Sequence, residues 1–195
     1  MGDKTAMAKL YFRYGTVGSA KTLNLLAVAH NYKTQDKKTF LIKPELDVRF
    51  GKNTIKSRAG LMVDADYLVG PDTVLNLDAF EGVHCVLVDE CQFLSPSVIE
   101  QLRKIATEQN IPVICYGLRT DFKQGLFEGS RRLLELSDTI EEVKNTCNFC
   151  NRKAIFNLRL LDGKPTLTGA VIELGADDKY VPACPPCYAL KTKGL

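Results

Sequence analysis

The chain has 195 residues, 45% of them hydrophobic, which is enough for one full domain with a small appendage. Its formal net charge is +3, and basic and acidic residues are interspersed, so charge gives no reason to expect nucleic acid as a partner. The first 30 residues contain no uninterrupted apolar run, and no later stretch approaches the roughly 20 apolar residues of a membrane span. We therefore expect a soluble cytoplasmic protein with no membrane partner.

Two patterns near the N-terminus predict a strand, a loop and a helix in succession. "AKLYFRYG" (residues 8–15) is typical of a strand, and "KTLNLLAVAHNYKTQ" (residues 21–35) is typical of a helix. This segment places Leu23, Leu26, Ala27 and His30 at helical spacing.

The following patterns alternate strands with a second helix. Strands are predicted at residues 38–44, 83–90 and 111–118. A helix is predicted after Ser95, a typical N-cap that precedes Pro96 at the first helical position. Its expected buried face consists of Val98, Ile99, Leu102, Ile105 and Ala106. This alternation implies an α/β fold with a mostly parallel sheet flanked by helices and with ligands at the carboxyl ends of its strands.

The stretch "GTVGSAKT" predicts a phosphate-binding loop that lacks its second glycine, because Ala20 stands in that position. We expect the Cβ of Ala20 to crowd the phosphates and to weaken nucleotide binding without abolishing it. In "VLVDE" an apolar strand ends in acids, which is how a second strand presents a carboxylate to Mg²⁺. The predicted site for ATP with Mg²⁺ consists of Gly15, Thr16, Val17, Gly18, Ser19, Ala20, Lys21, Thr22 and Asp89, with Thr22 and Asp89 as magnesium ligands. A glycine-rich turn and a strand end with solvated acids are the alternatives.

The seven cysteines form two groups. Three lie in or beside apolar runs and are expected to be buried thiols: Cys85, Cys91 and Cys115. The other four form two C-x-x-C pairs, which predict a structural Zn²⁺ site: Cys147, Cys150, Cys184 and Cys187. Disulfides are the alternative, which a reducing cytosol disfavours. The interval between the pairs exceeds the roughly 15–20 residues of a common zinc ribbon, so we expect an insertion there.

Several motifs together carry a family resemblance. "VDECQFL", "CYGLRTDF", "DKYVPAC" and the paired cysteines follow the near-complete phosphate loop in that order. The chain from about Lys9 to Tyr188 therefore resembles the thymidine kinase family of the cellular, zinc-containing type (type II deoxynucleoside kinases). This resemblance implies a P-loop (RecA-like) kinase domain at residues 1–143 and a zinc-binding domain with a lasso loop at residues 144–195.

The resemblance also implies an activity. It predicts transfer of the ATP γ-phosphate to the 5′-hydroxyl of thymidine or deoxyuridine in pyrimidine salvage, feedback inhibition by dTTP and a homotetramer. Glu90 matches the family's general base, and Asp89 matches the acid that orients magnesium. Asp47 and Arg49 match an Asp-x-Arg pair near the sugar, and Arg49 is expected to stabilise charge in transit. The implied catalytic residues are therefore Glu90, Lys21 and Arg49.

For the nucleobase, the resemblance implies a pocket of apolar and aromatic groups: Val17, Phe93, Leu118, Phe122, Phe127 and Tyr180. Individually these residues are equally typical of a core. The segment at about residues 163–175 matches a lasso that closes over the nucleoside, with Val171, Ile172, Glu173, Leu174 and Gly175 as the expected contacts. Asn157 stands where some members of the family carry a threonine near the thymine, and it is expected to contact the base.

Two other classes of function remain open at this point. A zinc ribbon with a degenerate phosphate loop would be a non-catalytic module that binds protein or nucleic acid, but residues 144–195 show no dense basic face. An ATPase of the strand-exchange or helicase kind would share the core topology, but it normally needs a longer chain.

Overall fold

A parallel sheet forms the centre of the molecule. The structure is a computed structural model that describes residues 7–172 and 179–195. Among these residues, six strands form one sheet in the order β5-β2-β6-β7-β1-β8, and all neighbouring pairs run parallel. The strands are β1 (Leu10–Tyr14), β2 (Thr39–Pro44), β5 (Tyr67–Val69), β6 (Cys85–Val88), β7 (Val113–Gly117) and β8 (Thr139–Glu142). The predicted α/β class is therefore confirmed.

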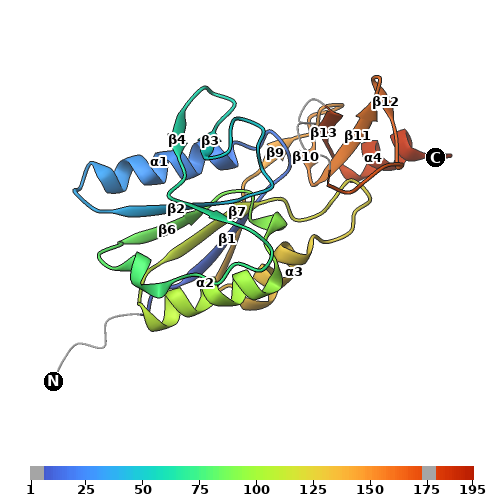
Figure 1. The fold of residues 1–195 in the computed structure, drawn as a ribbon. Helices are drawn as coiled ribbons and strands as arrows, with labels where there is room; N and C mark the ends of the chain where they lie inside the picture. The colour runs from blue at the N-terminus through green and yellow to red at the C-terminus, as the bar shows by residue number, and fades with distance from the viewer. Residues whose placement is uncertain (1–6, 173–178) are drawn as a thin grey trace.

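Helices cover both faces of this sheet (Figure 1). α1 (Lys21–Lys33) lies on one face, and α2 (Pro96–Glu108) and α3 (Glu128–Leu136) lie on the other. Successive strand residues point to opposite faces, so Leu87 packs in the cluster under α1 whereas Val86 packs in the cluster under α2. Both faces are buried, which is why the strands consist of continuous apolar runs. No helix in the described part of the chain combines the length and the apolarity needed to span a bilayer.

Helix α2 follows its sequence pattern closely. The Ser95 hydroxyl accepts a hydrogen bond from the Val98 amide at 3.5 Å, and Pro96 occupies the first turn. The predicted inner face is buried throughout: Val98, Ile99, Leu102, Ile105 and Ala106. The three thiols expected inside the sheet, those of Cys85, Cys91 and Cys115, are buried as well.

Helix α1 forms where the spacing predicts it, but only part of the set at helical spacing faces the sheet. Leu25 and Leu26 are buried with Tyr32 packed against them, whereas Ala27 and His30 are exposed. Leu23 is only half-buried, because it lines a cavity rather than the sheet. Because this helix is apolar on several sides, periodicity alone does not select the buried one.

Several short elements have no counterpart in the sequence patterns. A hairpin of β3 (Thr54–Lys56) and β4 (Met62–Asp64) follows β2, and the edge strands β5 and β8 complete the sheet. Two 3₁₀ turns, η1 (Leu77–Phe80) and η2 (Cys91–Phe93), flank β6. Segments of two to four residues are too short to show a hydrophobic period, so they depend on their neighbours for their conformation.

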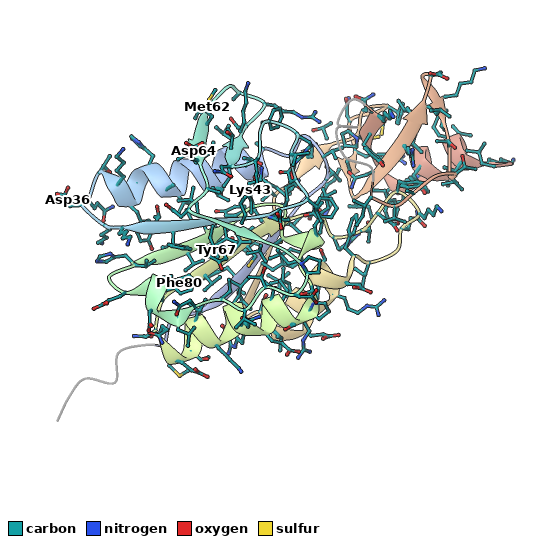
Figure 2. The ribbon with its side chains drawn as sticks, in the orientation of Figure 1. Asp36, Lys43, Met62, Asp64, Tyr67 and Phe80 are labelled. Atoms are coloured by element: carbon teal, nitrogen blue, oxygen red, sulfur yellow. The ribbon has the colours of Figure 1, made fainter. Side chains whose placement is uncertain are left out.

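Side chains on β2 anchor both the edge of the sheet and the hairpin (Figure 2). Phe40 packs on Phe80 with ring centroids 4.9 Å apart and on Tyr67 at 6.3 Å. Further along the strand, Lys43 is only 1% exposed, and its ammonium group donates to the Thr54 carbonyl at 3.0 Å. The chain that leaves β2 is therefore held over the carboxyl edge of the sheet.

The C-terminal segment forms a small antiparallel unit beside this edge (Figure 1). β9 (Asn145–Thr146) pairs with β10 (Lys153–Ala154), and β11 (Phe156–Leu161) lies between β12 (Lys164–Pro165) and β13 (Tyr180–Ala183). The helix α4 (Pro185–Thr192) follows β13. A separate cluster of buried apolar side chains, including Leu158 and Tyr188, packs between β11 and α4.

We predict that Leu102→Ala will lower the free energy of unfolding by about 2–5 kcal/mol, because Leu102 is fully buried between α2 and the sheet. Urea unfolding monitored by circular dichroism measures the change. The exposed Lys104 on the same helix provides the control, since Lys104→Ala should stay within about 0.5 kcal/mol of the unmodified chain.

Candidate active site

A loop at residues 15–20 connects β1 to α1 at the carboxyl edge of the sheet, and Lys21 and Thr22 begin the helix. The Gly15 amide donates a hydrogen bond to the Gly117 carbonyl at 3.2 Å. A Cβ on Gly15 would lie 2.5 Å from the Val143 carbonyl oxygen, closer than real Cβ contacts, so this position needs glycine. The start of the loop is therefore fixed against both strands that flank β1.

Lys21 occupies the inside of this loop and is only 8% exposed. Its ammonium group donates to the carbonyls of Gly15 at 3.2 Å and Thr16 at 2.8 Å, and it contacts the Ser19 hydroxyl at 3.4 Å. Burial lowers the pKa of Lys21, while the charges of two neighbouring carboxylates oppose that shift. A phosphate in this loop would meet the ammonium group together with the free backbone amides at the start of α1.

The backbone of Ala20 shows why glycine is usual at its position. Its φ is 64° and its ψ is 25°, in the left-handed region. A residue with a Cβ pays roughly 1–2 kcal/mol for this conformation, whereas glycine adopts it freely. The sequence predicts crowding of the phosphates by the Cβ, and the structure adds a conformational cost that is present before any nucleotide binds.

Asp89 directly follows β6 and faces the start of α1. It is 5% exposed, and the Thr22 hydroxyl lies 3.2 and 3.3 Å from its two carboxylate oxygens. Burial, together with the charge of the adjacent Glu90, raises the pKa of Asp89 to about 7. Hydroxyl and carboxylate oxygens are ligands that Mg²⁺ prefers, and the structure brings the two predicted magnesium ligands together.

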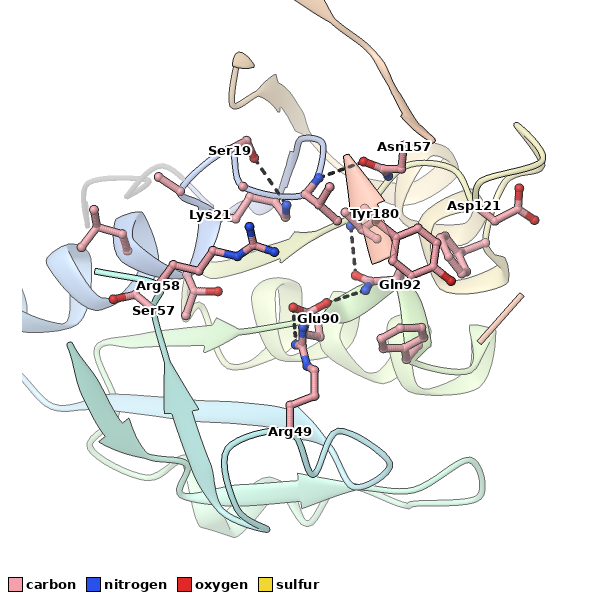
Figure 3. A pocket seen from close by; sticks show the side chains of 18 of the residues that line it. Ser19, Lys21, Arg49, Ser57, Arg58, Glu90, Gln92, Asp121, Asn157 and Tyr180 are labelled. Carbon is pink, nitrogen blue, oxygen red and sulfur yellow. Dashed lines mark hydrogen bonds and ion pairs between the residues drawn. The ribbon is translucent and has the colours of Figure 1, made fainter. Parts of the chain in front are cut away.

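Glu90 is held between a cation and an amide (Figure 3). One carboxylate oxygen accepts from Arg49 Nη2 at 2.6 Å, and the other accepts from Gln92 Nε2 at 2.5 Å. Burial alone would raise the pKa of Glu90, but the charges of Arg49 and Lys21 and the bond from Gln92 outweigh it, so the pKa lies below its usual range. Glu90 is therefore ionised and able to accept a proton. Its backbone, with φ 48°, is also left-handed, a strain typical of functional sites.

Arg49 is held in place by an ion pair with Asp47, which in turn pairs with Lys43. Asp47 accepts from Arg49 Nε at 2.7 Å and from Arg49 Nη2 at 3.2 Å, and it lies 3.5 Å from the ammonium group of Lys43. Burial would raise the pKa of Asp47, but the bond and charge of Arg49 and the charge of Lys43 hold it below its usual range. The guanidinium group of Arg49 therefore bonds Asp47 on one side and Glu90 on the other.

A cavity of about 450 Å³ joins the loop, the acids and a group of aromatic side chains. The predicted site residues that line it are Val17, Gly18, Ser19, Ala20, Lys21, Thr22, Arg49, Glu90, Phe93, Leu118, Phe122, Phe127, Asn157, Val171, Ile172 and Tyr180. Gly15, Thr16, Asp47 and Asp89 stand behind this lining and contact its members. Glu173, Leu174 and Gly175 lie outside the described residues.

The aromatic end of the cavity is built from two ring pairs. Phe93 and Phe127 meet edge to face with centroids 5.7 Å apart, and Phe122 lies 6.1 Å from Tyr180. The Phe122 carbonyl accepts a hydrogen bond from the Tyr188 hydroxyl, which ties this wall to α4. Flat apolar walls of this kind hold an aromatic ring by stacking and limit its size.

Asn157 lines the cavity, but its side chain is engaged elsewhere. Its Oδ1 accepts a hydrogen bond from the Val17 amide at 2.9 Å. The residue is 5% exposed and still belongs to the cavity lining. Contact of Asn157 with a base stays a prediction, and the bond to the loop is a second role that the sequence did not indicate.

Sequence reasoning missed several residues of the cavity, of which Gln92 is the clearest. Gln92 joins two strands, because its Nε2 donates to Glu90 while its Oε1 accepts from the Leu118 amide at 3.0 Å. Its position two residues after Glu90 in "VDECQFL" is the signal that was available. Arg58, in the turn between β3 and β4, also lines the cavity, and no local pattern marks it (Figure 3).

The two C-x-x-C pairs converge in the C-terminal segment. Cys147 and Cys150 lie in the β9–β10 turn, and Cys184 and Cys187 lie at the start of α4. All four Sγ atoms lie within 4.8 Å of one another, and that of Cys150 is 3.6 Å from Cys184 and 3.7 Å from Cys187. All four are free cysteines in the structure, and the two measured separations exceed the roughly 2.05 Å of a disulfide. Four thiolates about 2.3 Å from a tetrahedral zinc ion stand about 3.8 Å apart, so the donor set fits such an ion.

Comparison with known proteins supports the same assignment as the motifs. The thymidine kinase family model matches residues 8–188. The chain belongs to the thymidine kinase family. Among curated relatives, the "Thymidine kinase" of Enterococcus faecalis (strain ATCC 700802 / V583) is 42% identical and covers 93% of this chain and 95% of its own length. Those of Streptococcus pyogenes serotype M3 and Lactococcus lactis subsp. lactis are each 40% identical and cover 93% of this chain and 97% of their own lengths.

This membership confirms the part of the motif resemblance that concerns the thymidine kinase family. It identifies the chain as a kinase, so the non-catalytic binding module and the helicase-type ATPase are set aside. Among solved structures, the Pif1 helicase of Candida albicans superposes on 71% of this chain with a TM-score of 0.42 at 9% identity, a likeness too slight to bear on either fold or function.

We predict that Ala20→Gly will change the free energy of unfolding by between about 0 and +1.6 kcal/mol. Glycine removes the left-handed strain of roughly 1–2 kcal/mol, but it also frees the unfolded chain at a cost of about 0.4–1 kcal/mol. Urea unfolding measures the balance.

Ala27→Gly is the matched control for this variant. Ala27 is exposed in the middle of α1, where its replacement should lower stability by about 1 kcal/mol. An equal loss of stability in both variants would contradict the strain assigned to position 20.

Proposed function

We propose that this chain transfers the γ-phosphate of ATP to the 5′-hydroxyl of thymidine or deoxyuridine. The observation that carries the proposal is the position of Glu90, in one cavity with the phosphate loop and with the aromatic walls (Figure 3). A phosphate donor and a flat nucleoside can therefore meet at one carboxylate. The relatives that share about 40% identity over most of the chain are named for the same reaction.

The loop end of the cavity is suited to the triphosphate. Lys21 and the backbone amides at the start of α1 would bind the β- and γ-phosphates, and the oxygens of Thr22 and Asp89 would hold Mg²⁺. The ion would neutralise charge on the β- and γ-phosphate oxygens. Without a nucleotide, the Lys21 ammonium group donates hydrogen bonds to carbonyls of the loop. It must exchange these carbonyls for phosphate oxygens when ATP binds.

Glu90 would act as the general base at the centre of the cavity. The 5′-hydroxyl oxygen forms a bond to the γ-phosphorus as the bond to the β–γ bridging oxygen breaks, and ADP leaves with that bonding pair. The hydroxyl proton passes to the ionised carboxylate of Glu90. Arg49, which already contacts Glu90, would stabilise the charge on the phosphoryl group in transit.

The aromatic end would bind the pyrimidine. The rings of Phe93, Phe127, Phe122 and Tyr180 line this end of the cavity. They would stack on a flat pyrimidine, and we propose that they exclude the larger purines by size. Val171 and Ile172 line the same space and precede the remaining lasso residues, which we propose as main-chain contacts of the base.

We propose that the cysteine cluster holds one structural Zn²⁺ in a C-terminal domain at residues 144–195, next to a kinase domain at residues 1–143. Four thiolates leave no open coordination position, so the ion would have no part in catalysis. This is the zinc-containing, type II form of the family. Unpaired thiols of this kind fit a reducing cytoplasm, where we place the enzyme.

We also propose a homotetramer and feedback inhibition by dTTP, as the family resemblance implies. In one cavity, the thymine of dTTP could occupy the aromatic end while its triphosphate occupies the phosphate loop. Sedimentation equilibrium and inhibition kinetics measure these two properties.

The assay that tests the function measures phosphate transfer from labelled ATP to a panel of nucleosides, with and without Mg²⁺. We expect phosphorylation of thymidine and deoxyuridine, little with purine nucleosides, and none without the ion. Failure to phosphorylate any pyrimidine nucleoside would refute the proposal.

We predict that Glu90→Gln will lower kcat by about 10²–10⁴-fold, the usual effect of removing a general base, while thymidine binding changes little. Glutamine keeps the shape of the side chain but cannot take the proton. Steady-state kinetics and calorimetry separate the two effects. Glu81→Gln, on an exposed acid, should leave kcat unchanged. A kcat within a few-fold of the unmodified enzyme would remove Glu90 from the role of base.

We predict one zinc ion per chain, and its loss in Cys147→Ser. Because the ligands join the β9–β10 turn to α4, the variant should loosen the C-terminal segment before it unfolds the sheet. Elemental analysis and hydrogen exchange measure the two effects. Cys85→Ala, which removes a buried thiol of the sheet, should retain the zinc. Protein purified without chelators that contains no metal would contradict the assignment.

A further inference from the structure

Two asparagines of the C-terminal segment hold the phosphate loop from outside. Asn157, on β11, accepts a hydrogen bond from the Val17 amide at 2.9 Å. Asn145, on β9, donates to the Val17 carbonyl at 3.0 Å and to the Thr16 hydroxyl at 3.2 Å. Both backbone polar groups of Val17 are therefore bound by side chains that lie 140 and 128 positions further along the chain.

The polarity of these bonds is fixed by the backbone. An amide N–H can only donate and a carbonyl can only accept, so Asn157 must present its oxygen and Asn145 its NH₂ group. The other atom of the Asn145 amide accepts from the Thr146 N–H at 2.9 Å, which holds the same orientation. The two asparagines thus have opposite and non-exchangeable roles.

Both asparagines stand on segments that run into the cysteine cluster. Asn145 lies two residues before Cys147. Asn157 is opposite Pro182 on β13, the strand that ends just before Cys184. These two asparagines, which we call the asparagine clamp, therefore lie outside the central sheet, on strands next to the cysteine cluster.

The loop has few bonds of its own to set its shape around Ala20. The Ser19 amide donates to the Thr16 carbonyl at 3.3 Å, and Lys21 bonds carbonyls that phosphate must take over. Ala20, three residues after Val17, is left-handed, and an alanine tends to leave that conformation. An external restraint on Val17 opposes this tendency.

We infer that Asn145 and Asn157 are positioning residues that hold the loop in its phosphate-binding conformation and offset the absence of glycine at position 20. The inference rests on the ATP site proposed above. It assigns the C-terminal segment a role in binding the phosphate donor, in addition to covering the nucleoside.

Calorimetric titration with ATP in the presence of Mg²⁺ tests the clamp without any turnover. Asn157→Ala and Asn145→Ala should each weaken ATP binding by about 2- to 10-fold, the effect of one or two hydrogen bonds. Thymidine binding should change by less than about 2-fold. If Asn157→Ala weakens thymidine and leaves ATP unchanged, Asn157 is a base contact and the inference fails.

A pair of aspartate variants tests the polarity. Asn157→Asp keeps an acceptor for the Val17 N–H, whereas Asn145→Asp has no donor for the Val17 carbonyl. Both variants add one negative charge next to Val17, so electrostatic repulsion should weaken ATP binding to a similar extent in each. Asn145→Asp should therefore bind ATP more weakly than Asn157→Asp, and the reverse order or equal affinities would overturn the assignment. Thermal unfolding of each variant confirms that the fold is retained.

The Ala20→Gly background tests the link to the missing glycine. Because glycine holds the left-handed conformation without strain, loss of the Asn157 bond should weaken ATP less in Ala20→Gly than in the natural chain. Equal losses in the two backgrounds would separate the clamp from position 20 and overturn that part of the inference. If the unmodified chain binds no ATP, the proposed function fails; if it binds ATP and the asparagine variants bind equally well, the clamp alone fails.

Discussion

Ion pairs between buried groups of opposite charge hold the site together at the carboxyl edge of the sheet. Three cations and three carboxylates gather there with little access to water: Lys21, Lys43, Arg49, Asp47, Asp89 and Glu90. An ionised group in such surroundings is stable only beside a partner, and removing one partner leaves the other uncompensated. The loop after β1, the turn after β2 and the end of β6 are therefore tied to one another, although they are distant in the sequence.

The cavity has a charged end and an aromatic end, and the C-terminal segment contributes to both. At the charged end, Asn145 and Asn157 bind the Val17 backbone. At the aromatic end, Tyr180 faces Phe122 and the Tyr188 hydroxyl bonds the Phe122 carbonyl. Phosphate chemistry needs fixed charges, and recognition of a base needs flat apolar walls, so a segment that touches both ends is placed to align donor and acceptor.

Backbone strain appears at two points of the site, Ala20 and Glu90, where residues with a Cβ adopt left-handed conformations. Such conformations persist only when surrounding contacts impose them. For Glu90 these contacts are the bonds from Arg49 and Gln92, which aim the carboxylate into the cavity. For Ala20 they are the self-contacts of the loop and the bonds to Val17.

The sequence by itself determined the class of the fold, the phosphate loop, the acids after β6 and the cysteine pairs, because each is a local pattern of spacing or polarity. It also carried the family resemblance in short motifs. Only the tertiary structure decided which side of α1 is buried, that Gln92 joins Glu90 to the chain after β7, and that Asn157 bonds the Val17 amide of the loop. These features depend on contacts between residues up to 140 positions apart, and no local period or motif encodes which distant side chain completes a hydrogen bond.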